Sequence, residues 1–430
     1  MSTQAKTVAF HTMGCKLNFS ETSTISRDFV QHGFEKVNYQ DKADIYVINT
    51  CSVTENADKE ARKLIRQAKR RNPDSSVAVI GCYAQLKPDE IANMDGVDMV
   101  LGSEEKFNIL DHLDKMAMEQ DTIVLNSNID NLKDFRPSFS IGERTRSYLK
   151  IQDGCDYTCS FCTIPLARGR SRNADISSTM KIAREVVALG AKEIVLTGVN
   201  VGDYGKGSDE TFQDLLAELD KLDEIKRIRI SSIEPNLLNQ EIIEFCHLSN
   251  LFMPHYHMPL QSGSNKILKA MRRRYDRDHY QSKVELIKSL EPDACIGADV
   301  IVGFPGETND DFLDTYNFLK DLDISYLHVF SYSERQGTEA LKYNNPIPKT
   351  HRSERSKMLH ILSDKKRRYF HEQFLGTTRN VLFENKKNGL IYGHSDNYIQ
   401  VKIETSSDLI NTIHPTNFEN IDGTIIVGQL

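Results

Sequence analysis

Three cysteines lie within the short stretch GCDYTCSFC, which spans residues 154–162. They are Cys155, Cys159 and Cys162, and their spacing is C-x3-C-x2-C. The chain has only eight cysteines in 430 residues, so this stretch concentrates a scarce residue type. It directly follows the apolar run YLKIQD (148–153), which predicts a β-strand. The fold must therefore present three thiols at the end of one strand.

The spacing of these cysteines favours an iron–sulfur cluster. Structural zinc sites usually take four protein ligands in paired short spacings, which this stretch does not offer. Three thiolates at short spacing can instead hold three irons of a [4Fe–4S] cluster. The fourth iron then stays open to a substrate or cofactor. The alternatives are a zinc site and three unrelated buried thiols.

The rest of the composition fits a cytosolic globular protein without membrane contact. The chain is 39% hydrophobic and 27% charged, which is ordinary for soluble proteins. Its first residues lack the basic region and apolar core of a signal peptide. No apolar run approaches the ~20 residues that a membrane helix needs. In a reducing cytosol, clustered cysteines are metal ligands or redox groups more often than disulfides.

The first 125 residues alternate short apolar runs with helical patterns. A helix is predicted over 54–71, with Thr54 as its cap. Such alternation is typical of a parallel sheet covered by helices. The predicted strands cover 7–12, 44–50, 76–81 and 98–103.

Strand–helix alternation resumes after a polar stretch and then gives way to short strands. The runs that follow predict six βα units, which suggest a parallel barrel or partial barrel. A long basic helix follows over about 350–374, and the last segment reads as a small antiparallel β-barrel. The predicted core strands cover 148–153, 193–198, 227–233, 254–260, 294–303 and 326–332.

These patterns predict an α/β protein with three parts and one linker. The parts are an N-terminal parallel-sheet domain, a partial (β/α)6 barrel and a C-terminal β-domain. The predicted ranges are 5–120 for the first domain, 121–140 for the linker, 141–371 for the barrel and 372–430 for the last domain.

A second set of cysteines follows three strands of the N-terminal domain. Cys15, Cys51 and Cys82 come just after the runs at 7–12, 44–50 and 76–81. The carboxyl ends of parallel strands lie along one edge of a sheet, so these thiols should converge. Convergence again suggests a cluster with an open iron, although cysteines also pack as small buried hydrophobes. Packing is the prediction for Cys246 and Cys295, which have no such placement.

The C-x3-C-x2-C motif, with aromatic Phe161 before its last cysteine, resembles the radical S-adenosylmethionine enzymes. In that superfamily the methionine group of S-adenosylmethionine binds the open iron, and an electron from the cluster yields a 5′-deoxyadenosyl radical. The resemblance implies further cofactor contacts at the ends of later strands. This chain lacks the Gly-Gly-Glu segment of many members and has LTGVN (196–200) instead. The implied contacts are Phe161, Gly198, Asn200, Ser232, Glu234, Gln261 and Asp299.

Two cysteine sets and a C-terminal β-module together resemble the methylthiotransferases, whose last domain is called TRAM. That family has two branches that modify tRNA adenosines and one that modifies a ribosomal-protein aspartate. The segments GCKLN (14–18) and GCYAQ (81–85) resemble the branch acting on N6-threonylcarbamoyladenosine. The isopentenyladenosine branch and the ribosomal-protein branch are the alternatives. A scaffold without turnover is a rival of another class.

The resemblance implies an auxiliary cluster on Cys15, Cys51 and Cys82 that carries the sulfur. The implied product is adenosine 37 of tRNA, beside the anticodon, with a methylthio group on C2. The implied partners are the tRNA anticodon stem-loop and an electron donor such as flavodoxin or ferredoxin, and we expect a monomer.

The distribution of charge suggests where RNA binds. The net charge is −7, yet 352–373 holds seven Lys/Arg against three Asp/Glu, and MRRRYDR (271–277) is also basic. The segment 374–430 is acidic, with four Lys/Arg against six Asp/Glu. Such runs are often only solvated faces. Arg168 and Arg170 are predicted to meet a phosphate or the threonylcarbamoyl carboxylate, which Arg can bind by bidentate pairing.

Overall fold

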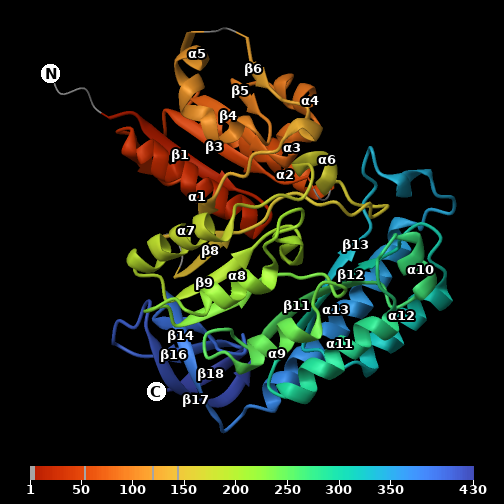
Figure 1. Cartoon of the computed structure of the whole chain (residues 1–430). Coiled ribbons are helices and arrows are strands. Elements are labelled where there is room, and N and C mark those ends of the chain that lie inside the picture. Colours follow the sequence, from red (N-terminus) through yellow and green to blue (C-terminus); the bar gives the residue numbers. More distant parts are fainter. Residues whose placement is uncertain (1–4, 53–54, 119–120, 143–144) are drawn as a thin grey trace. The chain divides into compact units, whose positions relative to one another are not determined.

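The computed structural model describes residues 5–52, 55–118, 121–142 and 145–430 (Figure 1). Thr54, the predicted helix cap, lies outside these residues. The chain divides into two compact units. Among the described residues, no helix is long and apolar enough to cross a membrane. The first unit comprises 1–140, 152–173 and 333–341, and the second comprises 141–151, 174–332 and 342–430.

These units divide the chain differently from the predicted domain ranges. The segment 152–173 carries Cys155, Cys159 and Cys162, and it belongs to the first unit. Both sets of three cysteines therefore lie in one compact unit.

The first unit is built on a six-stranded parallel sheet with the order β2-β1-β3-β4-β5-β6. Residues of β3 alternate between two cores, with Tyr46 and Ile48 on one face and Ile45 and Val47 on the other. Burial on both faces explains why the strands are continuous apolar runs. The strands are β1 (Thr7–Thr12), β2 (Glu35–Val37), β3 (Ile45–Thr50), β4 (Ser76–Gly81), β5 (Met99–Leu101) and β6 (Ile123–Leu125).

Helices cover both faces of this sheet. Helix α2 is amphipathic, and its apolar face, including Ala61, Leu64 and Ile65, packs into one core. Helix α1 contributes Ile25 and Phe29 to the other core. The polar stretch after β6 contains a short helix, Ile129–Asn131, and β7 (Ser138–Phe139), which lies against α1. The helices are α1 (Lys16–Gln31), α2 (Glu55–Arg71), α3 (Cys82–Leu86), α4 (Pro88–Ala92) and α5 (Leu113–Met118).

The core of the second unit follows the predicted βα order. Its parallel strands form two hydrogen-bonded groups, β10-β9-β8 and β11-β12-β13. The predicted partial barrel is therefore confirmed. The strands are β8 (Arg146–Lys150), β9 (Glu193–Thr197), β10 (Arg227–Ile230), β11 (His255–Gln261), β12 (Cys295–Val302) and β13 (Tyr326–Ser331).

Helices connect these strands in the sequence (Figure 1). The basic helix α13 packs against β13, the last strand of the core. The helices are α7 (Ile176–Ala188), α8 (Phe212–Leu219), α9 (Gln240–Leu248), α10 (Asn265–Ala270), α11 (Arg277–Leu290), α12 (Asn309–Asp321) and α13 (Lys349–Glu372).

The C-terminal segment closes into a five-stranded barrel with the order β14-β15-β16-β18-β17. Val381, Phe383, Val401 and Phe418 lie in its core. Strand β17 was not predicted from the sequence, because Pro415 and several Asn and Thr residues weaken its strand pattern. The strands are β14 (Thr378–Lys387), β15 (Leu390–Ser395), β16 (Gln400–Glu404), β17 (Ile413–Asp422) and β18 (Ile425–Gln429).

Candidate functional site

Cys15, Cys51 and Cys82 lie at the carboxyl ends of three neighbouring strands. Cys51 directly follows β3, and Cys82 directly follows β4 as the first residue of α3. Cys15 lies beyond β1 and caps the N-terminus of α1 in an extended conformation. Cys51 and Cys82 are buried, whereas Cys15 is exposed. The edge therefore presents two shielded thiols and one that solvent can reach.

The backbone beside Cys15 lies directly against Cys51. A Cβ atom on Gly14 would stand 2.6 Å from Cys51 Cβ and 2.8 Å from its Sγ. Gly14 also has a φ of +85°, which side chains other than glycine rarely adopt. Glycine is therefore required before Cys15 for two reasons, its backbone conformation and its closeness to the second thiol.

Charged groups surround the third thiol. Burial raises the pKa of the Cys82 thiol, the Arg168 guanidinium opposes that rise, and Cys15 adds to it. These interactions place Cys82, Cys15 and Arg168 in one electrostatic neighbourhood. A ligand that replaces the thiol protons would find a cation beside it.

The loop 152–173 holds the second cysteine set in hydrogen-bonded turns. Cys155 N–H donates to Gly169 O (3.0 Å), and Cys162 N–H donates to Cys159 O (3.2 Å). A Cβ on Gly154, whose φ is +70°, would stand 2.0 Å from Arg170 O, so glycine is again required before the first thiol. All three cysteines are half-buried.

Backbone N–H groups already point at two of these sulfurs. Tyr157 N–H donates to Cys155 Sγ, and Ile164 N–H donates to Cys162 Sγ, each at 3.4 Å. Donors of this kind stabilise thiolates and tune iron–sulfur clusters. Phe161 is half-buried in the same loop. The donor set therefore suits a thiolate-bound cluster.

Other predicted cofactor residues lie on successive strands of the second unit. Gly198 and Asn200 follow β9, Ser232 and Glu234 follow β10, and Gln261 ends β11. Asn200 is buried, and its Nδ2 donates to Asp203 Oδ2 at 3.0 Å. Glu234 forms an ion pair with Arg273. Gln261 adopts a positive φ of 70° at a register shift in the sheet, the kind of strained backbone that clusters at functional sites.

Asp299 lies inside β12 rather than beyond its end. Its Oδ1 shares a hydrogen bond with His257 Nε2 (3.0 Å), and Asp299 pairs in register with His328 of β13. One nitrogen or oxygen of each residue lies within 4.8 Å of the other two. Neither histidine was predicted from the sequence, because only the pairing of β11 and β13 with β12 brings them to Asp299.

Arg168 and Arg170 differ sharply in their surroundings. Arg170 is exposed, as expected of a substrate contact. Arg168 is only 1% exposed. The prediction that Arg168 meets substrate is not supported by this placement, because a phosphate would have to displace buried carboxylates. The η nitrogens of Arg168 donate to Asp153 Oδ1 (2.9 Å), Glu21 Oε1 and Oε2 (both 3.1 Å) and Asn18 Oδ1 (2.6 Å).

Two further buried residues contact side chains around the cysteines and were not predicted from the sequence. Lys106 Nζ lies 2.6 Å from Glu21 Oε2, and both side chains are buried. Arg335 donates to Ser52 Oγ, next to Cys51, at 2.5 Å. Neither motif nor spacing connects these residues to the cysteines, since each contact joins distant parts of the chain.

Some arginines of the predicted RNA-binding runs are buried and contact other groups of the protein. On α13, Arg355 forms a buried ion pair with Glu307 (2.5 Å), and Arg352 donates to Tyr332 O. In the run 271–277, Arg272 and Arg274 are exposed. These exposed side chains remain candidates for phosphate contacts.

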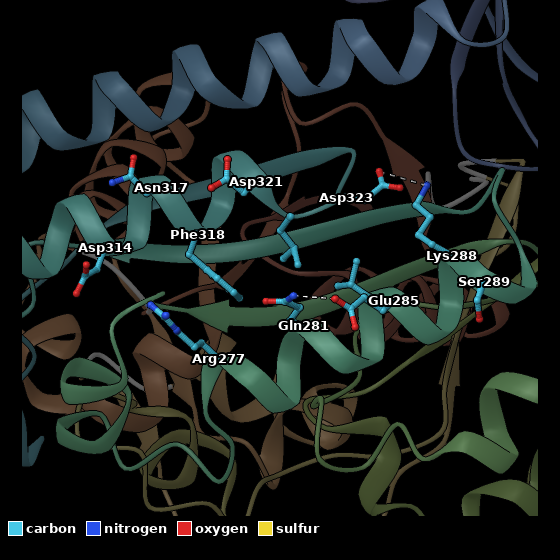
Figure 2. A pocket seen from close by; sticks show the side chains of 12 residues that line it. Arg277, Gln281, Glu285, Lys288, Ser289, Asp314, Asn317, Phe318, Asp321 and Asp323 are labelled. Carbon is cyan, nitrogen blue, oxygen red and sulfur yellow. Dashed lines mark hydrogen bonds and ion pairs between the residues drawn. The ribbon is translucent and has the colours of Figure 1, made fainter.

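A groove between α11 and α12 holds none of the predicted site residues (Figure 2). Its polar side chains interact with one another, as in Gln281 with Glu285 (2.7 Å) and Lys288 with Asp323 (3.8 Å). Nothing in this lining resembles a metal or cofactor site.

Known families match two regions of the chain. Residues 7–102 match the uncharacterized protein family UPF0004, and residues 149–319 match the radical SAM superfamily. The fold is similar to that of TsrM from Kitasatospora setae, a radical S-adenosylmethionine methyltransferase, with a TM-score of 0.56 and 13% identity. That match covers 76% of this chain and 73% of TsrM.

Curated relatives match almost the whole chain. The threonylcarbamoyladenosine tRNA methylthiotransferase MtaB of Bacillus subtilis is 41% identical over 418 residues, which cover 95% of this chain and 92% of the relative. MtaB of Aquifex aeolicus is 39% identical over 92% of this chain and 96% of its own length. A tRNA-2-methylthio-N(6)-dimethylallyladenosine synthase of Rickettsia bellii is 31% identical, with 88% of each chain covered. The chain belongs to the threonylcarbamoyladenosine tRNA methylthiotransferase family.

Proposed function

We propose that this chain converts N6-threonylcarbamoyladenosine, beside the anticodon of tRNA, to its 2-methylthio derivative. The observation that carries the proposal is the presence of both cysteine sets in one compact unit. The enzyme is a radical S-adenosylmethionine methylthiotransferase, and its family uses S-adenosylmethionine and two [4Fe–4S] clusters.

Each cysteine set has a distinct role in this proposal. Three thiolates from neighbouring strand ends would hold the auxiliary cluster, and three from the loop would hold the cluster that binds S-adenosylmethionine. When bound, these clusters supply an electron for S-adenosylmethionine cleavage and a place for the sulfur that is methylated and transferred. The auxiliary ligands are Cys15, Cys51 and Cys82, and the others are Cys155, Cys159 and Cys162.

The chain's own residues orient these groups. The N–H groups of Tyr157 and Ile164 would keep their hydrogen bonds to cysteine sulfurs. Exposed Cys15 leaves the auxiliary site reachable from solvent, as a large substrate requires. The C2–H bond of adenosine is not acidic, so proton transfer, which gives ~10²–10⁴-fold, would not suffice.

The partners of the reaction are also proposed here. RNA-binding proteins read splayed loop bases by stacking and edge contacts, so we infer that the adenosine leaves the anticodon loop. We propose Arg170, Arg272 and Arg274 as phosphate contacts because they are exposed cations. We expect a cytoplasmic monomer that takes electrons from a flavodoxin or ferredoxin.

The test begins with anaerobic reconstitution and an iron count. We expect about eight irons per chain, as two [4Fe–4S] clusters require. The loaded enzyme is then incubated with S-adenosylmethionine, a reductant and tRNA that carries N6-threonylcarbamoyladenosine, and its nucleosides are analysed by mass spectrometry. Matched tRNA with isopentenyladenosine and purified ribosomal protein serve as substrates of the alternative branches. Product from either of these, but not from the first tRNA, would refute the proposed substrate.

A further inference from the structure

Arg168 has one buried donor that lacks a partner. Its four η-nitrogen hydrogen bonds go to Asp153, Glu21 and Asn18, yet its Nε–H has no hydrogen-bond partner in the described part of the chain. Buried donors are almost always satisfied in native proteins by protein groups or ordered water, and an exception often marks a redox or catalytic site or a bound ion. An unsatisfied N–H on a fully buried cation therefore points to an acceptor that the polypeptide does not supply.

The surroundings of Arg168 identify the place of that acceptor. Arg168 ends the short helix α6 (Ile164–Arg168), which packs against α3, the helix that begins at Cys82. Ser103 Oγ donates to Ala167 O (2.6 Å) and fixes this helix end. Arg168 and Cys82 therefore lie on two short helices that pack against each other.

The partners of Arg168 lie close to cysteine ligands in the sequence. Asn18 and Glu21 are on α1, which begins after Cys15, and Asp153 lies two residues before Cys155. Lys106 holds Glu21 from another direction. The guanidinium plane is thus fixed by its η nitrogens, and rotation cannot turn the Nε–H away.

We propose that the Arg168 Nε–H donates a hydrogen bond to a sulfur of the iron–sulfur cluster held by Cys15, Cys51 and Cys82. This inference rests on the proposed function, which places a cluster there. Arg168 is then a positioning residue that acts on the cluster rather than on tRNA. Hydrogen bonds to sulfur stabilise the more negative, reduced cluster and raise its reduction potential.

The direct test detects the nitrogen itself. The full chain is prepared with Cys155, Cys159 and Cys162 changed to Ala, labelled with arginine enriched in 15N, and reconstituted. We expect about four irons, as one [4Fe–4S] cluster requires. Pulsed electron paramagnetic resonance of the reduced cluster should show a 15N coupling, which Arg168→Lys should abolish.

A redox titration supplies an independent readout. Arg168→Lys should lower the potential by about 59 mV, which equals a tenfold change in a one-electron equilibrium. Glu21→Gln is the matched control, because it disturbs the same buried network but retains the Nε–H. Loss of the buried Glu21 charge should raise its potential rather than lower it, and its 15N coupling should persist.

The outcomes separate the two proposals. No iron in the triple-Ala parent would refute the auxiliary site, and with it the proposed function. Four irons without a 15N coupling would overturn only the role of Arg168. A 15N coupling that survives in Arg168→Lys would come from another arginine, and it would also overturn the proposed role of Arg168.

Discussion

Arg335 and Asp58 form an ion pair in which both side chains are buried, with 2.9 Å between Arg335 Nη1 and Asp58 Oδ2. Arg335 also donates to Ser52 Oγ, and Ser52 donates to Asp58 Oδ1 (3.1 Å). Ser52 directly follows Cys51. The segment 333–341 therefore holds a proposed cluster ligand of the same compact unit in place.

Replacing Arg335 should destabilise the first unit and loosen Cys51. Arg335→Ala leaves Asp58 buried without its cation, which typically costs about 3 kcal/mol. We expect a lower free energy of unfolding in denaturant titrations and less than the parent's iron content. Lys59→Ala is the control, because its pair with Glu55 is exposed and should contribute under about 1 kcal/mol. Equal losses in both variants would contradict this role.

Gly14→Ala should disrupt the auxiliary site more than an ordinary glycine substitution. The new methyl group would stand 2.6 Å from Cys51 Cβ, so the loop must shift and iron loading at that site should fall. Gly33→Ala is matched, since its φ is also +85° but no atom lies within 4 Å of the new carbon. That control carries only the backbone strain of about 1–2 kcal/mol. Iron counts of the two variants decide the comparison.

Single cysteine variants should separate the two proposed clusters. Cys159→Ala should abolish 5′-deoxyadenosine formation, whereas Cys51→Ala should retain some cleavage but lose the methylthio product. Each variant should bind about four irons instead of about eight. Cys246→Ala, a buried thiol within α9, should keep all the iron and the product. Full product from Cys51→Ala would show that the auxiliary site is not needed.

The exposed arginines of the run 271–277 should contribute to tRNA affinity through charge. The double variant Arg272→Ala, Arg274→Ala should bind tRNA more weakly. The slope of log affinity against log salt concentration should become less steep by about 0.7 for each phosphate contact that is lost. Binding titrations at several salt concentrations measure this slope. Lys181→Ala with Arg184→Ala removes two exposed cations of α7 as a control. An identical slope in both double variants would argue against a specific contact.

The Asp311 carboxylate should make the free energy of unfolding fall as the solution becomes acidic. Burial tends to raise its pKa, but Lys266 and Thr308 lower the pKa from 3.8 to about 2. The stabilisation is therefore complete above about pH 4 and is lost as pH falls toward 2. Asp311→Asn should cost about 1 kcal/mol at pH 7, and the difference from the parent should shrink below pH 4. Denaturant titrations of the parent and Asp311→Asn across this pH range test the prediction. A difference in unfolding free energy that does not change with pH would contradict it.

Local patterns in the sequence predicted much of the fold. Apolar runs followed by cysteines predicted the three neighbouring strand ends of the first unit, because every strand of a parallel sheet ends at the same edge. The closed C-terminal barrel was predicted except for β17, where polar residues obscure the strand pattern. The order of the βα units in the core follows directly from the order of the apolar runs.

Only the tertiary structure decided the surroundings of those cysteines. Arg168 and Arg170 are two residues apart and chemically identical, yet one is buried and the other exposed. The buried contacts of Lys106 and Arg168 with Glu21, and of Arg335 with Asp58, join residues that are 85, 147 and 277 positions apart. The sequence by itself determined which cysteines share a strand edge or a loop, and where strands end. The charges around those residues depend on which distant segments fold together, and a local pattern carries no information about that.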